Sequence, residues 1–201
     1  MDPVTHAGLS VKRWGGQIND YYPIHHFIDS TKELCSDNRH RLLHTLWGVR
    51  RVVIPIFGPT ITNSEGKPVP VKEICEKDHI LPDYQNRFIP TLSDFVQALD
   101  FGDDHSWKTQ LETFHGKHVS NARLSRLLLS PLSLTGRLES LLITHNSWFL
   151  NEIAPQVLNT PPQLTEIDLT PAYLFEHMHF KLWMDNGTAL PPSARGGSHE
   201  P

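Results

Sequence analysis

Two stripes of apolar residues at helical spacing run through the first third of the chain. The first comprises Ile24, Phe27, Ile28 and Leu34. It follows Asp20, a residue type suited to an N-cap, and Pro23, which fits a first turn, so it predicts a helix over 20–35. After a break at 36–38, the second stripe comprises Leu42, Leu43, Leu46, Val49, Val53 and Ile54. We expect these two helices to form an antiparallel hairpin.

Turn-forming residues end the second helix and introduce a small region of β-structure. Gly58-Pro59 stops the helix, and apolar arms at 61–62 and 69–71 flank an Asn-Ser-Glu-Gly turn. This pattern predicts a short β-hairpin, which we place at an edge because the prolines in its second arm cannot donate hydrogen bonds to a neighbouring strand. Short helices are predicted near 71–79 and 91–99.

Leucines dominate the second half of the chain. The pattern predicts a helix over 104–115, a leucine-bearing helix from 121, a longer buried helix over 134–153, a connector over 155–170 and an amphipathic helix over 171–184. We therefore expect a mainly α fold, a compact helical domain with an N-terminal helical hairpin and one small β-hairpin. A single domain is predicted over 1–185, in which residues 101–185 pack as a helical extension on 6–100, followed by a flexible tail over 186–201.

Composition narrows the possible functions. The net charge of −4 is spread along the chain, which argues against binding of duplex nucleic acid through its phosphates. Cys35 and Cys75 are the only cysteines, so a disulfide framework or a thiolate zinc site is not expected. The sequence has no signal-peptide pattern and no apolar run long enough for a membrane span, so a cytoplasmic location is expected.

The count of 13 histidines is the strongest chemical clue in the sequence. On the first predicted helix His25 and Asp29 are four residues apart, and on the second His40 and His44 repeat that spacing. Residues four apart share one helix face, so the two pairs can converge across a hairpin. Imidazole and carboxylate groups together bind divalent zinc, iron or manganese. The alternative is that these are surface or hydrogen-bonded histidines, with Asp29 paired to Lys32.

Other polar residues extend the candidate site. His79 lies three residues after Glu76, a spacing that bundle metal sites use, although a solvated charged turn is the alternative. His145 interrupts the leucine-rich helix and either points into the same polar pocket or is a satisfied core histidine. Lys32, Arg39 and Arg41 are candidates for catalytic residues that neutralise charge on a small phosphate or carboxylate ligand, although the arginines could equally pair with nearby acids.

Residues 6–94 carry a family resemblance. It rests on His6, Lys12 to Gly16, Tyr22, the run His25-His26-Phe27-Ile28-Asp29-Ser30-Thr31-Lys32, the run Asp37-Asn38-Arg39-His40-Arg41 with His44, and 61–64. These features resemble an uncharacterised family of bacterial and phage proteins, a domain of unknown function, which implies a shared fold and no particular activity. The supply of His and Asp on helices also resembles the HD-type phosphohydrolases, but the sequence lacks their His-Asp dipeptide.

Two functional hypotheses follow. The first is a metal-binding helical protein that acts as a metal-dependent hydrolase of a phosphorylated or nucleotide-like substrate. The second is a non-catalytic binding or assembly protein whose histidine cluster is a structural hydrogen-bond network. In that case its C-terminal helices would mediate homo-oligomer formation or bind a protein partner. Familiar nucleophile and phosphate-loop motifs are missing from the sequence, which removes the best-known enzyme classes.

Overall fold

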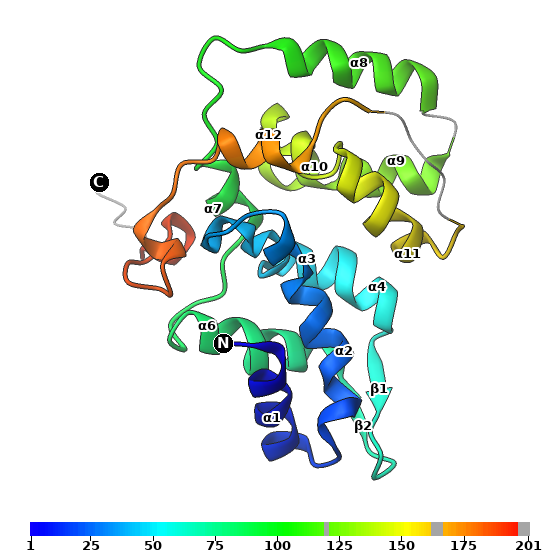
Figure 1. Ribbon diagram of the computed structural model, residues 1–201, viewed down its shortest axis with the longest axis vertical. Coiled ribbons are helices and arrows are strands. Elements are labelled where there is room, and N and C mark those ends of the chain that lie inside the picture. The colour runs from blue at the N-terminus through cyan, green and yellow to red at the C-terminus, as the bar shows by residue number, and fades with distance from the viewer. Residues whose placement is uncertain (119–120, 162–166, 197–201) are drawn as a thin grey trace. The chain divides into compact units, whose positions relative to one another are not determined.

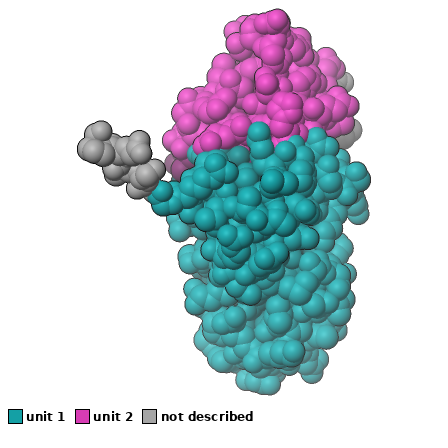
Figure 2. All heavy atoms as spheres, turned by 90° about the vertical axis from the view of Figure 1, so that its left-hand side faces the viewer, with its two compact units in different colours: residues 1–94, 180–201 teal, residues 95–179 magenta. Residues whose placement is uncertain are grey.

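The computed structural model describes residues 1–118, 121–161 and 167–196 (Figure 1). The fold is mainly α-helical with one two-stranded antiparallel sheet among the described residues, which confirms the predicted fold class. The chain divides into two compact units, residues 1–94 with 180–201 and residues 95–179 (Figure 2). The predicted packing of 101–185 on 6–100 stays a prediction.

The first unit contains most of the candidate site residues that the sequence analysis named. Its elements are α1 (Pro3–Trp14), α2 (Ile18–Asp29), η1 (Ser30–Glu33), η2 (Asn38–Leu43), α3 (Leu46–Gly48), η3 (Val49–Val53), α4 (Ile54–Phe57), β1 (Thr60–Thr62), β2 (Pro68–Pro70), α5 (Val71–Glu73), η4 (Ile74–Ile80), α6 (Leu81–Asp83), η7 (Leu182–Met184) and η8 (Pro192–Ala194). The short helix α7 (Leu92–Val96) spans the boundary between the units.

The chain begins with a helical hairpin formed by α1 and α2, which lie side by side (Figure 1). The apolar pattern did not predict α1, because the face that it buries carries His6, Ala7 and Ser10 rather than large apolar residues. Local chemistry explains the helix. The Asp2 carboxylate accepts hydrogen bonds from two backbone N–H groups of the first turn, and Pro3 occupies a position where no N–H is needed.

Helix α2 begins earlier than predicted. Its N-cap is Gln17, and Asp20 lies at the third helical position, where its carboxylate accepts a hydrogen bond from the Gln17 N–H at 2.7 Å. Asp20 is thus the second partner of a capping box and not the cap itself, and Pro23 lies inside the helix. The α-helix ends at Asp29, and the 3-10 helix η1 carries the chain on to Glu33.

The second predicted helix is interrupted. It consists of the 3-10 helix η2, a break at His44, and then α3, the π-helix η3 and α4. Thr45 restarts the helix because its hydroxyl accepts a hydrogen bond from the Gly48 N–H at 3.0 Å. A Cβ atom on Gly48 would lie 2.4 Å from the Leu43 carbonyl oxygen, so only glycine permits this close approach. The break leaves the His44 side chain fully buried.

The predicted β-hairpin is confirmed, and a longer helix than predicted follows it. Strands β1 and β2 pair in antiparallel register, with Ile61 opposite Val69. Elements α5, η4 and α6 then run without interruption from Val71 to Asp83. The middle of this helix is π-helical, a form that often occurs at functional sites.

The second unit contains α8 (Ser106–His118), α9 (Ala122–Leu128), α10 (Ser130–Thr135), η5 (Leu138–Ile143), η6 (Phe149–Ile153), α11 (Ala154–Leu158) and α12 (Pro171–Glu176). The single helix predicted over 134–153 is wrong, because Gly136 adopts a left-handed conformation that ends α10 and the chain breaks again between η5 and η6. The helix predicted over 171–184 is also shorter, since α12 ends at Glu176. The connector prediction falls partly on residues 162–166, and the tail prediction partly on 197–201; both stretches lie outside the described residues.

The two units share a local sequence of elements. In the first unit, a 3-10 helix over 38–43 is followed by the π-helix 49–53 and an α-helix that begins near Pro55. In the second unit, a 3-10 helix over 138–143 is followed by the π-helix 149–153 and an α-helix that begins near Pro155. The positions differ by 100 residues throughout. At the break, the first unit has His44-Thr45 where the second has Thr144-His145, so the histidine is displaced by one position.

Candidate metal centre

Six buried side chains gather in the first unit. They are His6 of α1, His25 and Asp29 of α2, His44 at the end of η2, His79 of η4 and Asp83 of α6. The four histidines are fully buried, and both aspartates are 5% exposed. Of the candidates from the sequence, the structure therefore brings His25, Asp29, His44 and His79 together.

Four side chains, His44, His79, Asp29 and Asp83, direct donor atoms towards one point. Their donor atoms all lie within 4.8 Å of one another. His44 Nε2 is 3.1 Å from His79 Nε2, 3.3 Å from Asp29 Oδ1 and 3.4 Å from Asp83 Oδ2. His79 Nε2 is 3.5 Å from Asp29 Oδ1 and 4.0 Å from Asp83 Oδ2. A tetrahedral ion with bonds of about 2.0–2.1 Å holds its ligand atoms roughly 3.3–3.4 Å apart. The separations from His44 Nε2, 3.1–3.4 Å, match this spacing, whereas those from His79 Nε2 to the two aspartates, 3.5 and 4.0 Å, are wider.

A chain of buried hydrogen bonds leads away from this point through His79. His79 Nδ1 lies 2.9 Å from His25 Nδ1, and His25 Nε2 lies 3.0 Å from the Ser10 hydroxyl. Ser10 donates its proton to Asp78 Oδ2 at 3.0 Å. The Asp78 carboxylate also accepts hydrogen bonds from Arg13 Nε at 2.5 Å and from the Trp14 indole N–H at 2.8 Å.

The direction of this chain fixes the position of each proton. Because Ser10 gives its only proton to Asp78, its oxygen must accept from His25 Nε2–H. A neutral His25 then has a bare Nδ1, which accepts from His79 Nδ1–H. A neutral His79 therefore presents a bare Nε2 to His44, Asp29 and Asp83. Both rings are neutral near pH 7, because burial lowers the pKa of His25 to about 3 and also holds the pKa of His79 well below its usual value.

Both aspartates at the point of convergence are charged. Burial alone would raise the pKa of each carboxyl. For Asp29, the largest influence against burial is a hydrogen bond from His44, and the pKa lies well below its usual range. For Asp83, His44, His6 and Arg41 have the same effect on the pKa. The site thus offers two carboxylates and the bare His79 nitrogen in the protonation states that a metal ion requires. His44 Nε2 donates to these acceptors, so it would release its proton on binding an ion.

His6, His25 and His79 also bring ring nitrogens within 4.8 Å of one another. Their geometry is less suited to an ion. The rings of His6 and His79 are stacked with centroids 3.9 Å apart and an interplanar angle of 17°. Nitrogen lone pairs lie in the ring plane, so those of two stacked rings do not converge. His6 instead binds the Asp78 carbonyl oxygen through Nδ1 at 2.8 Å and places Nε2 3.2 Å from Asp83 Oδ1.

The remaining candidates from the sequence lie around or away from the centre. Lys32 Nζ pairs with Asp29 Oδ2 at 2.7 Å, and Arg41 Nη2 lies 3.7 Å from Asp83 Oδ2. His40 is buried beside His44 but uses Nδ1 to donate to the Asp37 carbonyl oxygen at 2.6 Å, and burial lowers its pKa to about 4. Arg39 pairs with Asp37.

His145 belongs to the second unit. Its Nδ1 lies 2.8 Å from the Leu141 carbonyl oxygen, and its Nε2 lies 2.9 Å from His115 Nε2. Burial lowers the pKa of His145 to about 4. These contacts fit the alternative considered for it from the sequence, a satisfied core histidine.

Sequence reasoning did not include His6 and Asp83 among the ligand candidates. Asp83 follows His79 by four residues, and this spacing on one helix was the available signal. The three-residue spacing to His79 points to Glu76 instead, but the Glu76 carboxylate pairs with Lys72 at 2.6 Å. His6 gave no comparable signal, because its place in the cluster depends on how α1 packs against α2 and η4.

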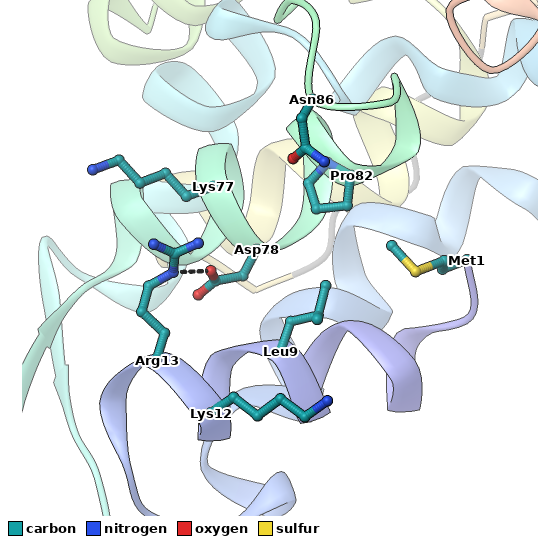
Figure 3. A pocket seen from close by; sticks show the side chains of 8 residues that line it. All are labelled: Met1, Leu9, Lys12, Arg13, Lys77, Asp78, Pro82 and Asn86. Atoms are coloured by element: carbon teal, nitrogen blue, oxygen red, sulfur yellow. Dashed lines mark hydrogen bonds and ion pairs between the residues drawn. The ribbon is translucent and has the colours of Figure 1, made fainter.

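A surface pocket of about 580 Å³ lies beside the hydrogen-bond chain (Figure 3). It is lined by Met1, Leu9, Lys12, Arg13, Lys77, Asp78, Pro82 and Asn86. Figure 3 shows the Arg13 side chain reaching Asp78 at the wall of the pocket. The chain from His79 through His25 and Ser10 therefore ends at a residue that lines this pocket.

Comparison with known proteins adds a family but no activity. Residues 1–107 match the model of a family described as "Domain of unknown function (DUF6915)". Neither the curated proteins nor the solved structures contain a significant match to the chain. Within the described residues, no helix is long and apolar enough to cross a membrane.

Proposed function

The chain belongs to this family of unknown function, and we propose from the geometry of its own residues that it is a metal-dependent hydrolase. Its ligands to one divalent transition metal ion are His44, His79, Asp29 and Asp83. The substrate is a phosphorylated or nucleotide-like compound. The observation that carries the metal proposal is the convergence of four donor atoms, the bare His79 Nε2 among them, that all lie within 4.8 Å of one another.

The donor set favours an ion that accepts both nitrogen and oxygen ligands. Two imidazoles and two carboxylates suit zinc, iron or manganese. Zinc in a tetrahedral site would have all four positions filled by protein, whereas an ion with five or six positions keeps room for a water molecule. A bound ion would lower the pKa of that water and so supply the nucleophile for hydrolysis.

The surrounding residues support the ligands in this proposal. Lys32 holds Asp29 Oδ2, which leaves Oδ1 for the ion. His6 and the amino group of Met1 lie 3.2 Å and 2.7 Å from Asp83 Oδ1, which leaves Oδ2. His25 orients His79 through its other nitrogen. Second partners of this kind fix ring orientation in known metal sites and strengthen binding.

A non-catalytic binding or assembly protein is the second candidate. It is favoured by the burial of the whole cluster, because a buried hydrogen-bond network can serve structure alone. The second unit would then supply an interface, and Leu129, Leu134 and Leu138 are 38%, 54% and 44% exposed there. Analytical ultracentrifugation tests this candidate, which predicts self-association or a stable complex.

Metal content measured by mass spectrometry on untagged protein tests the proposal. We expect close to one equivalent of zinc, iron or manganese in the wild type and its loss in His44→Ala. His26→Ala is the matched control, because His26 is an exposed histidine on α2. Metal-loaded protein is then assayed for phosphate release from phosphomonoesters and nucleotides. A folded wild type that takes up no metal from any of the three ions would refute the proposal and favour the structural network.

A further inference from the structure

Arg41 is a buried cation whose hydrogen bonds are incomplete. The residue is 5% exposed. Its Nη2 donates to Asn186 Oδ1 at 3.2 Å and lies 3.7 Å from Asp83 Oδ2. Its Nε and Nη1 have no hydrogen-bond partner in the part of the chain that the structure describes. A guanidinium carries five N–H groups, and leaving several of them unpaired in a buried position is costly.

A second unpaired donor belongs to the residue against which Arg41 packs. The Arg41 guanidinium carbon lies 5.2 Å from the centre of the Tyr84 ring. Tyr84 is fully buried, and its hydroxyl likewise has no hydrogen-bond partner among the described residues. Two residues in contact with each other, one of them next to a metal ligand, therefore both have spare donors.

Charge balance points in the same direction. With an ion bound, the two carboxylates Asp29 and Asp83 neutralise its two positive charges. Asp83 is also the carboxylate with which Arg41 pairs, so the Arg41 charge then has no counter-ion of its own. A buried charge without a partner is strongly unfavourable. With an ion bound, the positive charge of Arg41 is therefore left for an anion to neutralise.

We propose that Arg41, together with the ion and the Tyr84 hydroxyl, binds a small oxyanion such as phosphate or the terminal phosphate group of an ester. This inference rests on the proposed metal site and names the part of the substrate that the site holds. Arginine is suited to the role because its planar N–H groups match the oxygens of phosphate. The near-complete burial of Arg41 restricts the ligand to a small ion or an end group.

Isothermal titration of inorganic phosphate into metal-loaded protein tests the anion site. We expect binding that weakens at least tenfold in Arg41→Gln and changes less than twofold in Arg39→Gln. Arg39 is the matched control, because it lies two residues away on the same 3-10 helix and its Nε pairs with Asp37 at 3.0 Å. Acetate titrated in parallel distinguishes phosphate from a carboxylate ligand, and we expect it to bind more weakly.

Two milder variants keep the test decisive if Arg41→Gln does not fold. Arg41→Lys keeps the charge but loses the planar N–H groups, and Tyr84→Phe removes only the hydroxyl; each should weaken phosphate binding severalfold. The inference is overturned if the wild type binds metal but not phosphate. It is also overturned if Arg41→Gln and Arg39→Gln weaken phosphate binding equally, since Arg41 would then hold only ordered water. If no metal is taken up, the proposed function fails separately. Phosphate binding to the metal-free protein that depends on Arg41 would then still support the anion site, and no binding would overturn it.

Discussion

Replacing Ser10 with alanine tests whether the hydrogen-bond chain prepares His79 for a metal ion. The Ser10 hydroxyl is fully buried and makes hydrogen bonds at 3.0 Å to both His25 and Asp78. Without it, His25 Nε2–H loses its acceptor, and the ring is free to carry its proton on Nδ1 instead. That proton would face His79 Nδ1, and the proton of His79 would move to Nε2, the atom that is needed as a ligand.

The expected magnitude follows from these two effects. Loss of a buried hydrogen bond that leaves a donor unsatisfied costs on the order of 1–3 kcal/mol of folding stability. Loss of a partner behind a metal-bound histidine typically lowers metal affinity by about 10–100-fold. We therefore expect Ser10→Ala to remain folded with moderately reduced stability and to bind zinc or manganese at least tenfold more weakly than the wild type.

Competition with a chromophoric chelator measures the affinity, and nitrogen-15 NMR of the histidine rings reports which nitrogen carries the proton. Ser140→Ala is the matched control, because Ser140 is also fully buried and its hydroxyl donates to a backbone carbonyl in the second unit. The control should lose stability without losing metal affinity. A folded Ser10→Ala protein with wild-type affinity and an unchanged His79 tautomer would refute the reasoning.

Three further outcomes are expected. Asp83→Asn removes one ligand charge and should weaken metal binding. At a metal concentration 100 times the dissociation constant of the wild type, the metal should stabilise the wild type by about 2.7 kcal/mol and the variant hardly at all. Thermal unfolding with and without a chelator measures this difference. Gly48→Ala should destabilise the fold by about 1–3 kcal/mol in urea unfolding, because the new methyl group meets the Leu43 backbone. Gly116→Ala on α8, with open space around it, should be neutral or stabilising. Equal effects of the two substitutions would contradict the packing argument. His145, whose pKa burial lowers to about 4, binds fewer protons in the folded state than in the unfolded state between pH 4 and 6.5. Its contribution to stability should therefore fall by roughly 3 kcal/mol as the pH is lowered through that window, and His145→Gln should make the pH dependence less steep by about that amount in pH-resolved denaturation.

Local signals in the sequence were sufficient for several elements. Apolar residues at helical spacing predicted α2, and the turn residues between two apolar arms predicted the β-hairpin. The i,i+4 spacing of His25 and Asp29 placed both side chains on one face of α2 and into the candidate site. These predictions succeeded because each depends on residues close together in the chain, where spacing alone decides which side chains share a face.

Tertiary structure decided the composition of the site. The sequence offered His40 with His44 as an i,i+4 pair, but η2 is a 3-10 helix that ends at Leu43, so only His44 reaches the point where His79 and Asp83 meet Asp29. The hydrogen-bond chain through His25 and Ser10 joins residues of α1, α2 and η4, and the orphaned donors of Arg41 arise only from its burial. Donor geometry of this kind depends on how separate helices pack, to within fractions of an ångström, and no periodicity along a single chain encodes it directly.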